Sequence, residues 1–247
     1  MIALFKRIRK QFLGQNRLGK YLVYALGEII LVVIGILLAL QINTWNLKNI
    51  DKSKEVNYLA EIDDNLASDL GLIDSILNFN KAKQEAISTV IQTLGKPSNL
   101  NQAQILGPNL NILGQYDIFY PNDLGFQNLI SAESIGLISD NELRKGILDY
   151  YNFDFKSGTQ ERIETVTRNF VDYLIPIMTT QERIQQMYQV TVDIPKNEDV
   201  DVVNDQKMLS ILDLMNVVMQ FQNDILLDNK EKIHQLRSKI NSYQNKN

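Results

Sequence analysis

Residues 21–42 read YLVYALGEIILVVIGILLALQI, and this stretch decides the architecture that the sequence predicts. Glu28 is its only charged residue, and residues 29–40 contain ten Ile, Leu or Val side chains and no polar one. Each of these ten favours membrane insertion by roughly 0.3–0.6 kcal/mol, whereas an acid at the bilayer centre opposes it by about 2.5–3.5 kcal/mol. The apolar residues outweigh the acid, so we expect a transmembrane helix over residues 21–45.

Glu28 has two interpretations. Trp45, a typical interface anchor, follows it by 17 residues, about 25 Å of helix and close to the thickness of a hydrocarbon core. With Trp45 at one interface, Glu28 reaches the headgroups at the other. The alternative is an acid that acts inside the membrane, at a proton site or in a contact between helices. Gly35 and Ala39 form a small-xxx-small step on the same helix face, which favours self-association in lipid.

The residues before the span indicate its orientation. Residues 1–20 carry six bases and no acid, which places the N-terminus in the cytoplasm by the positive-inside rule. Phe5, Ile8 and Phe12 recur among these bases, so we expect a basic amphipathic segment on anionic lipid. No A-x-A-like cleavage pattern follows the span, which favours an uncleaved anchor in the inner (cell) membrane. Residues 46–247 are then extracytoplasmic, and periplasmic in a Gram-negative bacterium.

The composition narrows the classes of function. A chain with 45% hydrophobic and 22% charged residues is typical of a folded protein. Residues 29–247 carry 19 bases and 28 acids, a net charge of −9, which disfavours nucleic-acid binding. The chain has no Cys and one His, His234, so thiol chemistry, a usual zinc site and a Ser-His-Asp triad have no basis. We expect no metal, no cofactor and no enzymatic activity.

Two long helices are predicted from apolar residues that recur at alternating three- and four-residue spacing. The first covers residues 46–94, either continuous or broken at residues 78–80, and Gly95 and Pro97 end it. Three positions interrupt its apolar series: Asp69, Asn80 and Lys83. The second covers residues 205–243, and two positions interrupt its series: Gln222 and Asn229.

Shorter helices are predicted between these two, over residues 122–188. The first of them runs from residue 122 to residue 135. Three capping boxes mark helix starts, each with Ser or Thr three residues before Glu or Gln. They are Ser139 with Glu142, Ser157 with Gln160, and Thr179 with Glu182. Pro176 lies just before the third box, so we expect a break and a restart there.

The predicted fold is all-α, with one N-terminal transmembrane helix followed by an extracytoplasmic helical bundle built on two long antiparallel heptad helices. A coiled-coil pairing within one chain satisfies both apolar series, with the middle helices capping the distal end. Pairing between two chains would satisfy them equally.

Ten of the 20 aromatic residues lie between residues 116 and 173. Core packing accounts for most of them, and a pocket for a ligand or partner is the alternative. The candidate pocket aromatics are Phe126, Tyr150, Tyr151 and Phe170.

Two stretches resemble a known family. GEIILVVIGILLALQINTWN at residues 27–46 is similar to the anchor signature of a large bacterial family of uncharacterised single-pass membrane proteins, with its Gly-Glu pair, apolar run and Gln-x-x-x-Trp end. FQNLISAESIGLISDNELRKGILDYY at residues 126–151 resembles a second recurring segment of that family. The resemblance implies a domain of unknown function and no catalytic residues.

Three hypotheses for function follow. The leading one is a membrane-anchored, non-enzymatic interaction or sensing module, with the lipid bilayer and a protein partner or a second copy as its partners. The second is an oligomeric membrane-embedded subunit that uses Glu28 and the Gly35/Ala39 face. The third is a membrane-tethered enzyme with its site among the aromatic residues.

Overall fold

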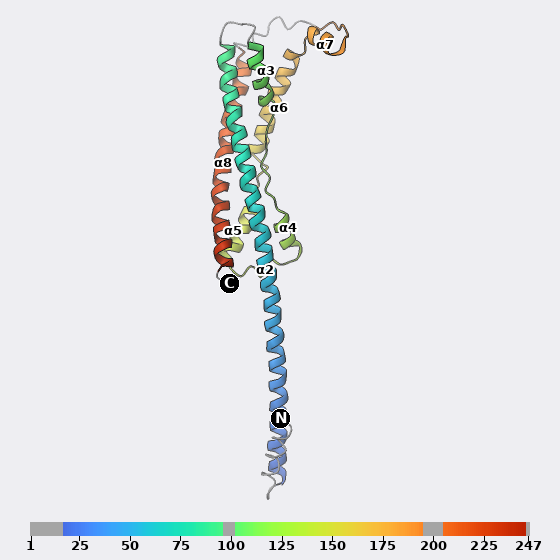
Figure 1. Cartoon of the computed structure of the whole chain (residues 1–247), viewed down its shortest axis with the longest axis vertical. Helices are drawn as coiled ribbons and strands as arrows, with labels where there is room; N and C mark the ends of the chain where they lie inside the picture. Colours follow the sequence, from blue (N-terminus) through green and yellow to red (C-terminus); the bar gives the residue numbers. More distant parts are fainter. Residues whose placement is uncertain (1–16, 96–101, 195–204, 246–247) are drawn as a thin grey trace. The chain divides into compact units, whose positions relative to one another are not determined.

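A computed structural model describes residues 17–95, 102–194 and 205–245, and every regular element within these ranges is helical (Figure 1). In chain order the elements are α2 (Arg17–Leu94), α3 (Gln102–Leu113), α4 (Leu124–Ser131), the short 3-10 helix η1 (Ile135–Leu137), α5 (Asn141–Tyr151), α6 (Thr159–Met178), α7 (Gln181–Tyr188) and α8 (Gln206–Gln244). The predicted all-α class is therefore confirmed. The amphipathic segment expected at the start of the chain lies mostly outside the described residues.

The chain divides into two compact units, residues 1–57 and residues 58–247, and α2 contributes to both. Within the described residues, α2 is the one helix long and apolar enough to cross a membrane by length and composition. No part of its most apolar window is buried. The helix continues through residues 45 and 46 without interruption, so the predicted end of a membrane segment at residue 45 stays a prediction.

In the second unit, α8 runs antiparallel to the portion of α2 beside it (Figure 1). Three side-chain contacts fix this direction. Arg237 pairs with Asp63 through two nitrogens at 2.8 and 3.0 Å, Lys230 Nζ lies 2.5 Å from Asp74 Oδ1, and Asn80 Nδ2 donates to Gln222 Oε1 at 2.7 Å. Residue numbers rise along α2 as they fall along α8, as predicted for an intramolecular pair.

The two apolar series are buried as their spacing predicts. On α2, Leu59, Ile62 and Val90 are fully enclosed, and on α8 so are Leu212, Met219 and Ile233. Burying each such side chain contributes about 1.5–3 kcal/mol. The helix has no break at residues 78–80, because the Asn80 amide is bonded across to α8 and does not compete for the backbone of its own helix.

Helices α3, α4, α5 and α6 pack along this pair and do not cap one end of it, which corrects the predicted arrangement, whereas α7 buries no residue. α4 and α5 lie beside one half of the pair, and α3 and α6 beside the other (Figure 1). Two separate hydrophobic clusters result. The first cluster contains the buried apolar residues of α2 between Leu59 and Ile76, together with Leu226, Ile233 and Ile240 of α8. The second cluster contains Ala86 and Val90 of α2, Phe170 of α6, and the buried apolar residues of α8 between Met208 and Met219.

The predicted capping boxes are wrong in detail. Asp140, and not Ser139, caps α5, because its carboxylate accepts the backbone N–H of Leu143 at 3.0 Å. Thr180, and not Thr179, caps α7 by accepting from the N–H of Arg183 at 3.2 Å. The break and restart after Pro176 are confirmed, since α6 ends at Met178 and α7 begins at Gln181.

The box of Ser157 with Gln160 and one helix end are also corrected. α6 begins after Gly158, whose φ of 82° suits glycine, and the Gln160 side chain is used in the core. The helix predicted over residues 122–135 ends at Ser131. Glu133 takes a left-handed conformation with φ 52°, and the chain turns into η1.

Candidate functional site

A layer of polar side chains separates the two hydrophobic clusters, and we call it the polar belt. It consists of six residues from three helices: Asn80 and Lys83 on α2, Gln160 and Thr167 on α6, and Gln222 and Asn223 on α8. All of them except Asn223 are buried. Asn80, Lys83 and Gln222 occupy the positions where the two apolar series are interrupted, and the heptad register brings them inside.

Three amides connect α2, α8 and the segment before α4. Asn80 Nδ2 donates to Gln222 Oε1 at 2.7 Å and to Asn223 Oδ1 at 2.8 Å. Gln222 Nε2 in turn donates to the carbonyl of Asp117 at 3.1 Å. A buried polar side chain at one heptad position fixes the register of paired helices, and this network does so for α2 and α8.

Gln160 holds the chain segment around Phe119 against α6. Its Oε1 accepts the backbone N–H of Phe119 at 2.5 Å, and its Nε2 donates to the Phe119 carbonyl at 2.8 Å and to the carbonyl of Phe155. One side chain thus satisfies three buried backbone groups of irregular segments, which would otherwise destabilise the fold by about 1–3 kcal/mol each.

Lys83 is the most unusual member of the belt, with 1% of its surface exposed. Its Nζ donates to Thr167 Oγ1 at 3.0 Å and to the carbonyl of Gln115. No carboxylate lies within ion-pair distance of it in the described part of the chain. Burial alone therefore lowers the pKa of Lys83 to about 8, because the charged ammonium loses its hydration.

A second buried polar group lies inside the first cluster. Tyr150 donates its hydroxyl to Asp69 Oδ2 at 2.8 Å, and the Asn122 N–H donates to Asp69 Oδ1 at 2.8 Å. Burial raises the pKa of the Asp69 carboxyl, and these two hydrogen bonds only partly oppose it. Burial and the adjacent Asp69 carboxylate also raise the pKa of the Tyr150 hydroxyl.

The structure brings three of the four candidate aromatics together. Phe126 stacks on Tyr151 with ring centroids 4.6 Å apart, and Tyr151 meets Tyr150 edge to face at 4.9 Å. Phe170 lies in the other cluster. The four residues pack in the core, and none of them lines the pocket described next.

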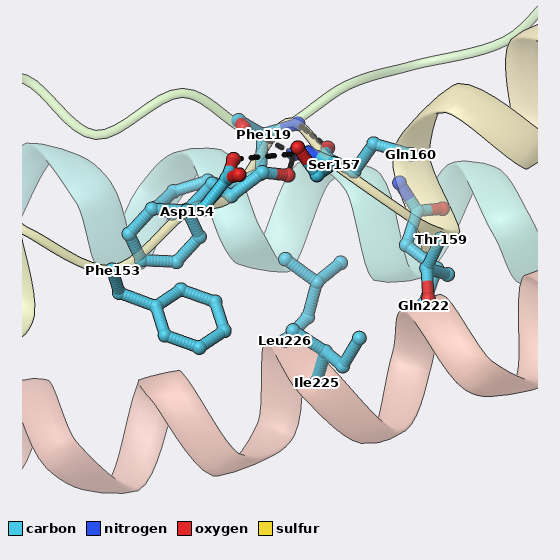
Figure 2. Close-up of a pocket in the computed structure, with 10 residues that line it drawn as sticks. Phe119, Phe153, Asp154, Ser157, Thr159, Gln160, Gln222, Ile225 and Leu226 are labelled. Atoms are coloured by element: carbon cyan, nitrogen blue, oxygen red, sulfur yellow. Dashed lines mark hydrogen bonds between the residues drawn. The ribbon is translucent and has the colours of Figure 1, made fainter.

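That pocket lies against the polar belt and has a volume of about 50 Å³ (Figure 2). Its apolar walls are Phe119, Phe153, Phe155, Ile225 and Leu226, and its polar edge is formed by Asp154, Ser157, Thr159, Gln160 and Gln222. A cavity of about 150 Å³ binds benzene, and this pocket is much smaller, so it suits an alkyl group of a few carbons.

Phe153 forms the exposed wall of the pocket, and 43% of its surface is accessible. Its ring meets Phe155 edge to face at 4.8 Å, and Lys232 Nζ lies 5.4 Å from its centroid. The sequence places these phenylalanines in the aromatic-rich stretch but does not distinguish them from the core aromatics. Their neighbour Asp154 gives a local signal in the sequence, because Asp followed within four residues by Ser and Gly is typical of a turn. In the structure, Asp154 Oδ1 accepts the N–H groups of Lys156 and Ser157.

The candidate membrane-face residues Glu28, Gly35 and Ala39 are all exposed on α2. A methyl group added at Gly35 would meet no atom within 4 Å, so this face is open to a neighbour. Among the described residues, no group of three or more His, Asp or Glu side chains is placed to hold a metal ion.

These features define an all-α protein that has an exposed apolar stretch of α2 and a helical domain. The chain belongs to a family of unknown function, DUF6090, which it matches over residues 28–158. The matched region begins at Glu28 and ends at Gly158, so it contains most of α2, all of α3 to α5 and the loop side of the pocket. No curated protein matches the chain, and no solved structure does.

Proposed function

We propose that the chain is a single-pass membrane protein whose residues 21–45 cross the bilayer. The observation that carries this proposal is the exposure of the apolar stretch of α2, where residues from Leu26 to Leu40 present about half or more of each large side chain. Exposed apolar surface of this extent requires a covering apolar phase. A length of about 20 apolar residues matches a hydrocarbon core.

The basic residues before the span favour a cytoplasmic N-terminus and an extracytoplasmic domain. The chain has no Cys, so single cysteines report its topology cleanly. In intact cells, we expect a membrane-impermeant maleimide to label Ser238→Cys on exposed α8 and to label Gln11→Cys only after lysis. Labelling in the reverse order would contradict the orientation, and release of the protein by alkaline carbonate would contradict the anchor.

We further propose that the helical domain is a non-enzymatic interaction or sensing module. The support is the pocket, whose size fits one side chain of a partner and whose polar edge includes the belt residues Gln160 and Gln222. Crosslinking in native membranes should recover a complex with a second protein or a second copy. A chain that remains monomeric and without a partner at all crosslinker lengths would contradict this proposal.

An oligomeric membrane-embedded subunit is the second candidate function, and the open face at Gly35 is the observation that favours it. Under this alternative, Glu28→Gln abolishes the cellular phenotype while membrane insertion is retained. Wild-type behaviour of Glu28→Gln would remove this candidate and leave Glu28 as a residue of the bilayer interface.

A further inference from the structure

An apolar stripe lies on the outer surface of α8. It consists of Leu214, Val217 and Phe221, which follow one another at three- and four-residue spacing and so share one helix face. Their exposed fractions are 52%, 37% and 56%, although α8 buries its heptad-spaced apolar series on another face. Ile225 follows Phe221 by one turn and lines the pocket. The stripe therefore leads into the pocket.

Acidic side chains line one edge of this stripe. Asp213 precedes Val217 by four residues, and Asp224 follows Phe221 by three. Asp228 lies one turn further on, and all three acids are exposed. Residues 208–229 contain these three acids and no base. Lys207 lies beyond one end of this stretch and contacts the ring of Tyr173. Lys230 and Lys232 lie beyond the other end, where Lys230 pairs with Asp74 of α2 and Lys232 contacts the ring of Phe153.

The charge of the stripe decides between two kinds of occupant. A second copy of α8 would bring its own acids against these, and juxtaposed like charges oppose association. A helix with Lys or Arg on its flanks would instead pair with the acids while its apolar face covers Leu214, Val217 and Phe221. The stripe and Ile225 span 12 residues, from 214 to 225, which is about three turns and 16 Å.

We infer that the partner of this module is a cationic amphipathic helix of about three turns, which lies along the α8 stripe and inserts one alkyl side chain into the pocket between Phe153 and Ile225. This inference rests on the proposed interaction function and identifies its partner class. The pocket volume of about 50 Å³ selects an aliphatic anchor over an aromatic one.

The test uses the full-length chain in nanodiscs of zwitterionic lipid, with empty nanodiscs as the background. The probe is a fluorescent three-turn helical peptide with Leu at alternating three- and four-residue spacing and Lys on both flanks. The comparison peptide keeps the Leu residues and replaces each Lys by Glu. We expect fluorescence anisotropy to detect saturable binding of the Lys peptide, at least about tenfold tighter than that of the Glu peptide.

Matched variants locate the binding surface. Leu214→Ser and Phe221→Ser remove exposed apolar contacts and should each weaken the Lys peptide by about tenfold. Leu227→Ser is the control, since Leu227 is on the same helix with the same 52% exposure as Leu214 but on another face. Combined replacement of Asp213, Asp224 and Asp228 by Lys should reverse the preference between the two peptides.

Two results would overturn the inference: absence of saturable binding by the Lys peptide, or equal weakening by Leu227→Ser and Leu214→Ser. The proposed interaction function is judged separately by the crosslinked complex in native membranes. If that complex forms and persists in Phe221→Ser, the partner class is wrong and the interaction function stands. If no complex forms in the wild type, the interaction function itself fails.

Discussion

Burial of Lys83 lowers the stability of the fold. Its pKa falls from an ordinary 10.5 to about 8, which corresponds to roughly 3 kcal/mol of unfavourable free energy for the buried ammonium at neutral pH. The two hydrogen bonds to Thr167 and Gln115 keep the side chain in place. A buried cation without a carboxylate is rare in cores, and it marks the belt as more than packing.

The lowered pKa of Lys83 makes stability depend on pH in a defined direction. Between pH 8 and 10.5 the unfolded chain holds a proton on Lys83 that the folded chain has released. The free energy of unfolding should therefore rise with pH across this window. Lys83→Met should lack the rise and be about 1–2 kcal/mol more stable than wild type at pH 7. Urea unfolding followed by circular dichroism at several pH values measures both effects. A Lys83→Met variant with the wild-type slope would refute the assignment.

The raised pKa of Asp69 makes the free energy of unfolding depend on pH in the opposite direction, at acid pH. Because burial raises its pKa, the folded chain keeps a proton that the unfolded chain releases just above pH 3.8, so stability falls as pH rises from there. Asp69→Asn should remove that fall and preserve partners for Tyr150 and Asn122. Asp69→Ala leaves the Tyr150 hydroxyl without an acceptor and should be about 1–3 kcal/mol less stable at neutral pH. Equal stability of the Asn and Ala variants would contradict this account.

At the scale of the helices, periodicity predicts more than local signals do. The four-three spacing identifies the helices α2 and α8. It marks Asn80, Lys83 and Gln222 as interruptions of the apolar series, but it does not predict that these polar side chains are buried. The cap of α5 is missed because Ser139 and Asp140 are both good caps, and only the backbone geometry at Asp140 selects between them. The partners of the belt residues join distant segments and have no local signature.

The pairing of α2 with α8 can be tested through the Asn80–Gln222 contact. Gln222→Leu removes the hydrogen bond from Asn80 Nδ2 and leaves the Asp117 carbonyl without its donor. We expect this variant to be less stable by about 1–3 kcal/mol. The double variant Asn80→Leu/Gln222→Leu should recover part of that loss, since both partners become apolar. A double-mutant cycle by chemical unfolding gives the coupling energy. Strict additivity of the two substitutions would show that the contact does not contribute.

The start of α6 depends on a single glycine. Gly158 has φ 82° and ψ −101°, a conformation that side chains with a Cβ rarely adopt. Gly158→Ala should lower stability by about 1–3 kcal/mol, measured as a shift of the unfolding midpoint. Gly136→Ala serves as the control, because a methyl group there meets nothing within 4 Å. A loss at Gly136 equal to that at Gly158 would argue against a conformational cause.

For the whole molecule, the belt divides the core into parts of unequal size. Among the described residues, the first cluster contains 17 buried hydrophobic members and the second contains 12. Because local stability follows buried apolar contact, we expect the second cluster to open at the lower free energy. Hydrogen exchange with mass spectrometry should show faster exchange over residues 86–94 and 208–219 than over 59–76 and 226–240. Uniform protection across both would mean that the belt does not separate cooperative units.

At this scale the sequence predicts the helical class and the antiparallel pairing, and it does not predict the pocket. The apolar series of α2 and α8 each lie within a single helix, so the spacing of residues along the sequence predicts them directly. The pocket arises where Phe119, Phe153 and Ile225 converge from three separate segments. Their convergence depends on the Gln160 bonds to Phe119 and Phe155, which no spacing encodes.

The two walls of the pocket lie on different sides of the boundary of the family match. Phe119 and Phe153–Ser157 positions fall inside the region shared with the family, whereas Ile225 and Leu226 belong to α8, beyond its boundary at residue 158. The family match therefore covers the loop wall of the pocket and not its helical wall. A side chain held in this pocket would contact residues on both sides of that boundary.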